Sequence, residues 1–312
     1  MNTADLNTAI NDAVKALRDG RLVGMPTETV YGLAADAGNT EAVARVFAAK
    51  GRPSFNPLIS HVANVEFATM EGEFDERATL LADEFWPGPL TMVVPVTSTA
   101  RSSELARAGL STIGLRVPAH PLAQQLLAAF GGPLSAPSAN PSGRLSPTDA
   151  GDVERELSDA VSLVLDGGAC DTGIESTIVS VLPGEPIRLL RPGAISREAL
   201  EALVGPLEAA EKNKISAPGQ LSSHYAPRAE LRLDAKEARA GEALLGFGPD
   251  APAECVNLSA SGDTVEAAAN LYRSLRELDA SDVDTIAVMP IPKTGLGEAI
   301  NDRLRRAAAP RD

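Results

Sequence analysis

The stretch from Lys50 to His61 restricts the possible folds more than any other part of the chain, because a helix must stop there and a strand begin. Residues 41–50, before the turn, carry apolar side chains at helical spacing, which predicts an amphipathic helix. Gly51 is typical of the residue that ends a helix, and Pro53 prevents the helix from restarting. Residues 58–62 form an apolar run that predicts a buried strand. We therefore expect an α/β fold in which this turn has a rigid backbone.

Two cations, Lys50 and Arg52, lie on this turn, and His61 follows at its far end. Between Lys15 and Lys212 the chain has no lysine other than Lys50. A pair of cations on a preorganised turn suits a polyanion such as a triphosphate. The alternative is that Lys50 only complements the helix dipole and that Arg52 is an ordinary loop cation.

Composition narrows the class of protein. The chain has 312 residues, 44% of them hydrophobic, which allows a sizeable core and favours two domains. A net charge of −14 argues against a main surface that coats nucleic acid, so we expect no stable nucleic-acid binding. The two cysteines lie far apart and form no metal or disulfide pattern, and no signal peptide or apolar membrane span is evident. These features predict a cytoplasmic protein without a membrane segment.

Strands and helices alternate along the chain in two blocks. Residues 1–206 predict an α/β sandwich around a twisted sheet, and residues 229–312 predict a second, small α/β domain. Residues 207–228 are rich in charged, proline, glycine and serine residues, as is typical of a linker. The pair His224 and Tyr225 within this linker either anchors it or belongs to a lid that reaches back to the first domain.

Polar residues gather in two further places. Arg116 lies on the predicted strand 112–117, where it requires either an anionic ligand or a structural ion pair. Residues 133–148 form either an ordinary turn-rich loop or a stiff wall of hydroxyl, amide and backbone donors. Ser146 or Thr148 is alternatively the N-cap of the following helix. The sequence has no Walker A motif, nucleophile elbow or zinc-protease pattern.

Taken together, these motifs resemble those of the two-domain L-threonylcarbamoyladenylate synthases, in which a small C-terminal domain follows a YrdC-like domain. The resemblance covers nearly the whole chain. It rests on the segments 26–33, 50–61, 86–91, 114–118, 135–143, 175–178, 191–193, 224–227 and 295–300.

The resemblance implies a fold and an activity. The fold is a YrdC-like twisted open sheet with a large concave cavity, whose mouth the linker crosses, followed by a small Rossmann-like α/β domain. The activity converts L-threonine, bicarbonate and ATP to threonylcarbamoyl-AMP and pyrophosphate. The product would pass to downstream proteins that transfer the threonylcarbamoyl group to tRNA. Mg²⁺ would be carried by the phosphates of ATP, without a metal site made by the protein.

By the same resemblance, catalysis needs no protein nucleophile, and Lys50 and Arg52 are the candidate catalytic residues because they would position and neutralise the phosphates. The residues implied in ATP binding are Lys50, Arg52, Asn56, Thr112, Ser138, Asn140, Ser146, Arg191 and His224 or Tyr225. The residues implied in threonine binding are Thr29, His61, Arg116, Ser176 and the backbone of Ala136, with Tyr31 as a wall of the pocket.

Two other functions are compatible with parts of the sequence. YrdC-like domains also occur in carbamoyl-transferring enzymes, but the chain has no room for the zinc-binding and acylphosphatase-like modules that usually accompany them. An RNA-binding or translation-regulatory module could use the same concave surface, although the net acidity and the lack of a series of stacking aromatics count against it.

Overall fold

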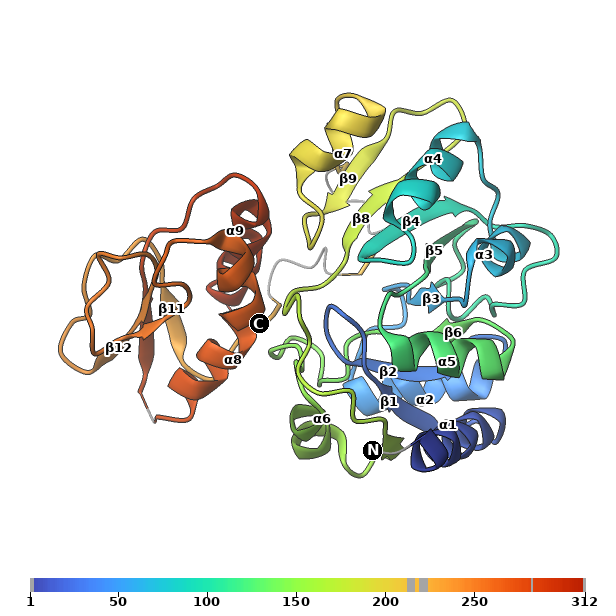
Figure 1. Ribbon diagram of the computed structural model, residues 1–312, viewed down its shortest axis with the longest axis horizontal. Coiled ribbons are helices and arrows are strands. Elements are labelled where there is room, and N and C mark those ends of the chain that lie inside the picture. The colour runs from blue at the N-terminus through green and yellow to red at the C-terminus, as the bar shows by residue number, and fades with distance from the viewer. Residues whose placement is uncertain (1–2, 212–216, 219–223, 282, 311–312) are drawn as a thin grey trace.

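The computed structural model describes residues 3–211, 217–218, 224–281 and 283–310. The described residues form two sheets, one of ten strands and one of four (Figure 1). The strand order is β10-β9-β8-β4-β5-β3-β6-β2-β1-β7 in the large sheet, which mixes parallel and antiparallel pairs, and β11-β14-β12-β13 in the small one. The predicted α/β class is confirmed.

The strands of the large sheet are β1 (Leu22–Met25), β2 (Gly32–Asp36), β3 (Ile59–His61), β4 (Leu90–Pro95), β5 (Thr112–Arg116), β6 (Leu134–Ser135), β7 (Val161–Val164), β8 (Thr177–Ser180), β9 (Arg188–Arg191) and β10 (Glu208–Ala209). The helices of the same part of the chain are α1 (Thr3–Arg18), α2 (Thr40–Lys50), α3 (Val65–Glu71), α4 (Glu76–Phe85), α5 (Pro121–Phe130), α6 (Ala150–Leu157) and α7 (Arg197–Val204).

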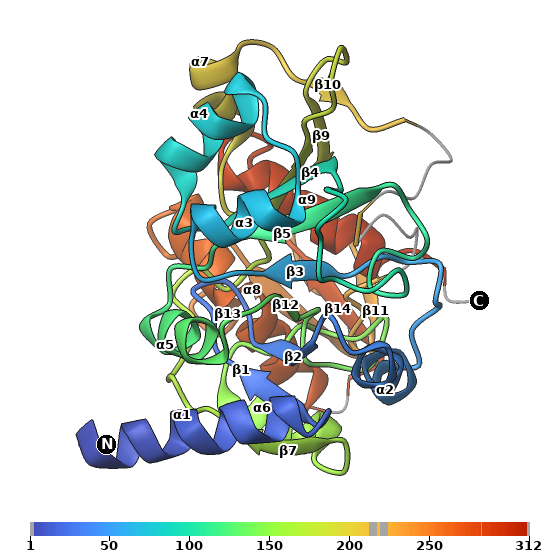
Figure 2. The same ribbon diagram turned by 90° about the vertical axis from the view of Figure 1, so that its right-hand side faces the viewer.

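Helices cover the two faces of the large sheet unequally. Figure 2 views the sheet from its side, with α3, α4 and α5 on one side and α2 on the other. At β4 and β5, alternate side chains such as Met92 and Leu115 pack against α4 and α7 in a large apolar cluster. The opposite face carries Val93 and Ile59, whose apolar cluster includes only a few alanine side chains from beyond the sheet. This thinly covered face leaves room for a cavity.

The junction that follows α2 has the predicted geometry. The helix ends at Gly51, which has a left-handed φ of 59°, and β3 begins a few residues later. The N-cap of α2 is Asn39, whose side chain accepts hydrogen bonds from the amides of Glu41 and Ala42. For α6, the alternative that Ser146 or Thr148 forms the cap is wrong: Asp149 caps this helix by accepting from the amide of Asp152.

The C-terminal part contains β11 (Glu230–Arg232), β12 (Glu242–Gly246), β13 (Val256–Asn257), β14 (Thr285–Val288), α8 (Thr264–Asp279) and α9 (Leu296–Ala307). All described strand pairs in this sheet are parallel, and the specific Rossmann-like arrangement stays a prediction. The domain boundaries also stay predictions. Within the expected linker, residues 212–216 and 219–223 lie outside the described residues, and β10 extends the large sheet beside β9.

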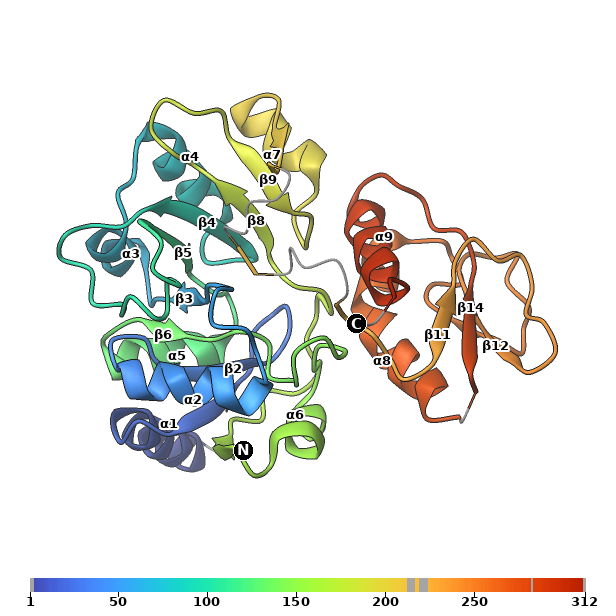
Figure 3. The same ribbon diagram turned by 180° about the vertical axis from the view of Figure 1, so that it is seen from behind.

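The two sheets are joined through α8 and α9, which lie between them (Figure 3). One apolar cluster is shared, because Val30 and Ile174 of the first domain pack with Leu271 and Ile300 of the second. At Gly173 the backbone of α8 comes so close that an added Cβ would lie 2.5 Å from the carbonyl oxygen of Ala269. The contact between the domains is therefore a continuous core.

No helix in the described ranges combines the length and apolarity that a membrane span requires.

Neighbouring leucines on α4 provide a test of the core. Leu81 is completely buried in the cluster against β4 and β5, whereas Leu80 is 44% exposed. We expect Leu81→Ala to lower the free energy of unfolding by about 2–5 kcal/mol, because it leaves a cavity. Leu80→Ala should cost less than about 1 kcal/mol. Urea denaturation measures both, and equal losses would contradict the described orientation of α4.

Candidate active site

A cavity opens on the thinly covered face of the large sheet. Its wall comes from the loop before β2, the junction before β3, strand β5, the loop after β6, the segments at β8 and β9, and the linker. The lining residues are Thr27, Thr29, Val30, Gly32, Arg52, Ile59, His61, Arg116, Ala136, Pro137, Ser138, Glu175, Ser176, Arg191, Pro218, His224 and Tyr225.

Two buried arginines line this cavity without a carboxylate partner among the described ion pairs. Arg52 donates from Nε to the carbonyl of Asn56 at 3.2 Å and from Nη2 to that of Pro57 at 2.9 Å. Arg191 donates from Nη2 to the carbonyl of Ser176 at 2.9 Å and to its hydroxyl at 3.1 Å. Burial lowers the pKa of Arg52 to about 10, but its guanidinium stays charged at neutral pH. The hydrogen bonds of both cations lead to neutral oxygens, and only Arg191 also has a carboxylate nearby, that of Glu175, so the pair forms a site for anions.

Lys50 has a different place from the one expected. Its ammonium donates to the carbonyl of Ser138 at 2.6 Å and also to the carbonyl of Asn140. Its own carbonyl accepts from the amide of Ser142 at 2.7 Å. Burial, together with the nearby charge of Arg52, lowers its pKa. Lys50 therefore holds the loop 138–142 against the end of α2 and does not line the cavity, so its predicted contact with phosphate stays a prediction.

Two threonine hydroxyls are ordered by a chain of hydrogen bonds. Thr27 Oγ1 donates to the carbonyl of Val30 at 2.6 Å and lies 2.8 Å from Thr29 Oγ1. Because a hydroxyl has one proton, Thr29 must donate to Thr27. The lone pairs of Thr29 then remain for a donor inside the cavity, such as an ammonium group.

Arg116 forms an ion pair across the cavity wall. Its Nη2 lies 2.7 Å from Oε1 of Glu28, and Nε donates to the carbonyl of Gly88 at 3.3 Å. Burial raises the pKa of Glu28, but the charge and the hydrogen bond of Arg116 outweigh this and lower it. The structural ion pair anticipated as one alternative is present. Arg116 also lines the cavity, where the carboxylate of a ligand could reach its guanidinium group.

Both histidines at the cavity are buried and neutral. His61 and His224 are 3% and 6% exposed, and the Nδ1 atom of each has no hydrogen-bond partner among the described residues. Burial is the main cause that lowers the pKa of each imidazole to about 3, and the charges of neighbouring arginines contribute to this shift. Buried polar atoms are normally satisfied, so unpaired atoms at a cavity wall indicate contacts that a ligand completes.

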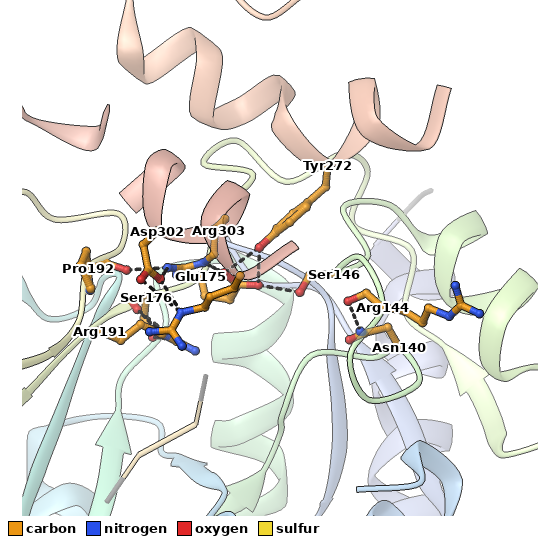
Figure 4. Close-up of polar contacts among 11 residues, drawn as sticks. Asn140, Arg144, Ser146, Glu175, Ser176, Arg191, Pro192, Tyr272, Asp302 and Arg303 are labelled. Carbon is orange, nitrogen blue, oxygen red and sulfur yellow. Dashed lines mark hydrogen bonds and ion pairs between the residues drawn. The ribbon is translucent and has the colours of Figure 1, made fainter. Parts of the chain in front are cut away.

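Glu175 lines the cavity, and its carboxylate accepts hydrogen bonds from three side chains (Figure 4). Ser146 Oγ donates to it at 2.5 Å, Tyr272 OH at 2.9 Å and Arg303 Nε at 2.7 Å. Burial raises its pKa, but the charges of Arg303 and Arg191 and these hydrogen bonds lower it to about 2. Glu175 is therefore permanently ionised and unsuited to act as a general base near neutral pH.

The structure gathers most of the predicted residues at one cavity. Those that line it are Thr29, Arg52, His61, Arg116, Ala136, Ser138, Ser176, Arg191, His224 and Tyr225. Those that do not line it are Tyr31, Lys50, Asn56, Thr112, Asn140 and Ser146.

Most of the predicted residues that do not line the cavity lie behind its wall, whereas Thr112 lies elsewhere. The hydroxyl of Tyr31 donates to the carbonyl of Gly168 at 2.8 Å, which holds this side chain in the core instead of the pocket wall. The side-chain amide of Asn140 donates to the carbonyls of Pro141 and Arg144, both at 2.9 Å (Figure 4). Thr112 lines a second cavity, at the opposite end of β5 from Arg116.

The sequence did not predict a place in the site for Thr27, Glu175 and Pro218, which line the cavity, or for Glu28, which pairs with Arg116. Glu28 and Glu175 belong to recognisable motifs, but their partners are distant in sequence. The buried partner of Glu175 in α9 gives no local signal, since Arg303 looks like one of several basic residues of an amphipathic helix.

Comparison with known proteins agrees with this geometry. The model of the Sua5, YciO and YrdC family, described as "Telomere recombination", matches residues 15–193. The chain belongs to this family. A second model, described as "Threonylcarbamoyl-AMP synthase, C-terminal domain", matches residues 195–309. The family's two-domain, Sua5-type members are therefore the appropriate comparison.

Two curated proteins and one solved structure of the Sua5 type are similar to the chain over nearly its full length. A threonylcarbamoyl-AMP synthase from Bacillus subtilis is 39% identical, with 97% of this chain and 93% of that protein covered. One from Pyrococcus abyssi is 38% identical, with 96% and 94% covered. The crystal structure of P. abyssi Sua5 complexed with L-threonine superposes with a TM-score of 0.88 at 35% identity, with 96% and 94% covered.

The two neutral histidines give a prediction about pH. The unfolded chain protonates them near pH 6.5, whereas the folded protein does so only near pH 3, so acid weakens folding below pH 6.5. In NMR spectra of the labelled imidazoles, His61 and His224 should stay neutral from pH 8 to pH 5. A titration of either ring with a midpoint above pH 6 would contradict the described burial.

Proposed function

We propose that this chain is a threonylcarbamoyl-AMP synthase, which forms threonylcarbamoyl-AMP and pyrophosphate from L-threonine, bicarbonate and ATP. The observation that carries the proposal is the cavity itself. It places buried cations without carboxylate partners next to a separate group formed by Thr29, His61 and Arg116. The buried cations suit a triphosphate, and the group formed by Thr29, His61 and Arg116 suits a small amino acid.

The amino-acid subsite is proposed at Arg116. Its guanidinium would receive the threonine carboxylate, while Glu28 keeps it oriented. The lone pairs of Thr29 would accept from the amine, and the unpaired Nδ1 of His61 is free to bond to the ligand. The relative from P. abyssi, whose structure was determined with L-threonine, supports the choice of amino acid.

The nucleotide subsite is proposed between Arg52, Arg191 and the loop 138–142. The two guanidiniums would bind phosphate oxygens, and Lys50 would keep the loop in place so that its backbone and Ser138 meet the nucleotide. His224 and Tyr225 of the linker, which both line the cavity, would cover the bound ATP. The parts of the linker between them and β10 include residues outside the described ranges.

The chemistry then needs positioning and charge neutralisation. The threonine amine and bicarbonate form a carbamate with loss of water. A carbamate oxygen attacks the α-phosphorus, the bond to the bridging oxygen breaks, and pyrophosphate leaves with the electron pair. Arg52 and Arg191 neutralise charge on the phosphates as this occurs.

Mg²⁺, the downstream steps and the location are further parts of the proposal. The described residues contain no group of three His, Cys, Asp or Glu side chains that could hold a metal, so phosphate oxygens and water would bind the Mg²⁺ that ATP brings. The product would pass to the proteins that modify tRNA, and the reaction would take place in the cytoplasm, where ATP and tRNA are both present.

Pyrophosphate release tests the proposal directly. With ATP, bicarbonate and each of the twenty amino acids in turn, we expect release above background with L-threonine alone, because Thr29, His61 and Arg116 select a small hydroxyl amino acid. Omission of bicarbonate should abolish the signal. If the folded protein released pyrophosphate with none of the twenty amino acids, the proposed function would be rejected, and carbamoyl transfer or RNA binding would be favoured.

A further inference from the structure

Two cavity segments are held in place by side chains of the C-terminal domain. One is the pair Glu175 and Ser176 before β8, and the other is the linker pair His224 and Tyr225. Both pairs line the cavity, and the described contacts of Glu175 and Tyr225 lead to the same two residues of the second domain, Tyr272 and Arg303.

The contact at Glu175 is charged and buried (Figure 4). Arg303 of α9 is 1% exposed, and its Nε lies 2.7 Å from Oε2 of Glu175. The hydroxyl of Tyr272, on α8, lies 2.9 and 3.0 Å from the two oxygens of the same carboxylate. Arg303 also donates from Nη1 to the carbonyl of Pro192 at 2.9 Å, next to Arg191.

The contact at Tyr225 uses the same side chains. The guanidinium of Arg303 lies 4.9 Å from the centre of the Tyr225 ring, and the ring of Tyr272 is stacked 6.0 Å from it. Tyr225 has a φ of 63°, which a bulky residue rarely adopts unless its surroundings hold it there. The amide of His224 donates to the carbonyl of Arg306, also in α9, at 3.2 Å.

The first domain alone does not replace these contacts. Ser176 is tied to Arg191 and to the hydroxyl of Thr91 at 2.8 Å, but the carboxylate of Glu175 has only Ser146 as a first-domain hydrogen-bond partner among the described residues. Without Arg303 and Tyr272, a buried carboxylate would lose its cation and most of its donors. It would then move toward water or take up a proton, and Ser176 and Ser146 would move with it.

We propose that Arg303 and Tyr272 are positioning residues of the active site: by holding Glu175 and Tyr225, they fix the threonine and nucleotide subsites from the second domain. The inference rests on the proposed function for its effect on substrates. It assigns the C-terminal domain a role in completing the cavity without any contact of its own with substrate.

The experiment compares ion pairs that cross the same domain boundary. Tyr272→Phe removes only the hydroxyl, Arg303→Met removes the cation, and Arg303→Lys restores the charge without the planar fork. Arg197→Met is the control for a more exposed ion pair across the same boundary. Arg197 bridges α7 to Glu298 of α9 at 2.7 Å and does not line the cavity. All variants are made in the full chain, and circular dichroism establishes that each is folded.

Two readouts distinguish positioning from general stability. Amide hydrogen exchange of residues 174–180 should quicken about tenfold or more in Tyr272→Phe and Arg303→Met, and stay unchanged in Arg197→Met. The KM and Kd for L-threonine should rise about tenfold in Tyr272→Phe and more in Arg303→Met, with partial recovery in Arg303→Lys.

Unchanged exchange and unchanged threonine affinity in the folded variants would overturn the proposal, as would equal effects in Arg197→Met. Should Arg303→Met fail to fold, Tyr272→Phe decides by the same two readouts. A wild-type protein that neither binds threonine nor releases pyrophosphate would reject the proposed function. The hydrogen exchange of residues 174–180 would still decide whether Arg303 and Tyr272 hold this segment.

Discussion

The structure of the site depends on buried positive charge that the protein itself leaves incompletely neutralised. Lys50, Arg52 and Arg191 are each less than a tenth exposed, and their described hydrogen bonds lead to carbonyl, amide and hydroxyl oxygens. Burying a cation without a carboxylate is costly, and carbonyl dipoles compensate for only part of that cost. The polyanion proposed to bind here would supply the rest, and this would explain why so rigid a turn leads into β3, a central strand of the sheet.

The rest of the molecule keeps these charges at fixed positions. The tight end of α2 at Gly51 aims Lys50 at the loop 138–142 and carries the chain directly to Arg52. On the other side of the cavity, Glu28 and Glu175 have different tasks. Glu28 orients the arginine proposed to bind a carboxylate, whereas Glu175 connects the first domain to the second. Neither is available to move protons near neutral pH, which agrees with catalysis by positioning.

Local signals in the sequence were sufficient for much of the fold, whereas most candidate site residues followed only from the resemblance to the family. Glycine and proline at 51 and 53 defined the helix-to-strand junction, and polar residues in otherwise apolar strands indicated Arg116 and His61. Contacts between distant residues could not be predicted in this way. The partners of Lys50 are backbone carbonyls some ninety residues away, and Arg303 looks like a surface residue of an amphipathic helix until the fold buries it against Glu175. Asp149 caps α6 in place of the alternatives Ser146 and Thr148, and the hydroxyl of Ser146 donates instead to the carboxylate of Glu175.

The central claim is that one cavity holds two separate subsites, one for the amino acid at Arg116 and one for ATP at Arg52. Calorimetric binding of both ligands to Arg116→Leu and Arg52→Leu tests this claim most directly. We expect a crossed result, in which Arg116→Leu loses affinity for L-threonine and keeps that for ATP, and Arg52→Leu does the reverse. Loss of ATP affinity with intact threonine affinity in Arg116→Leu would contradict the assignment and show that the two subsites are exchanged.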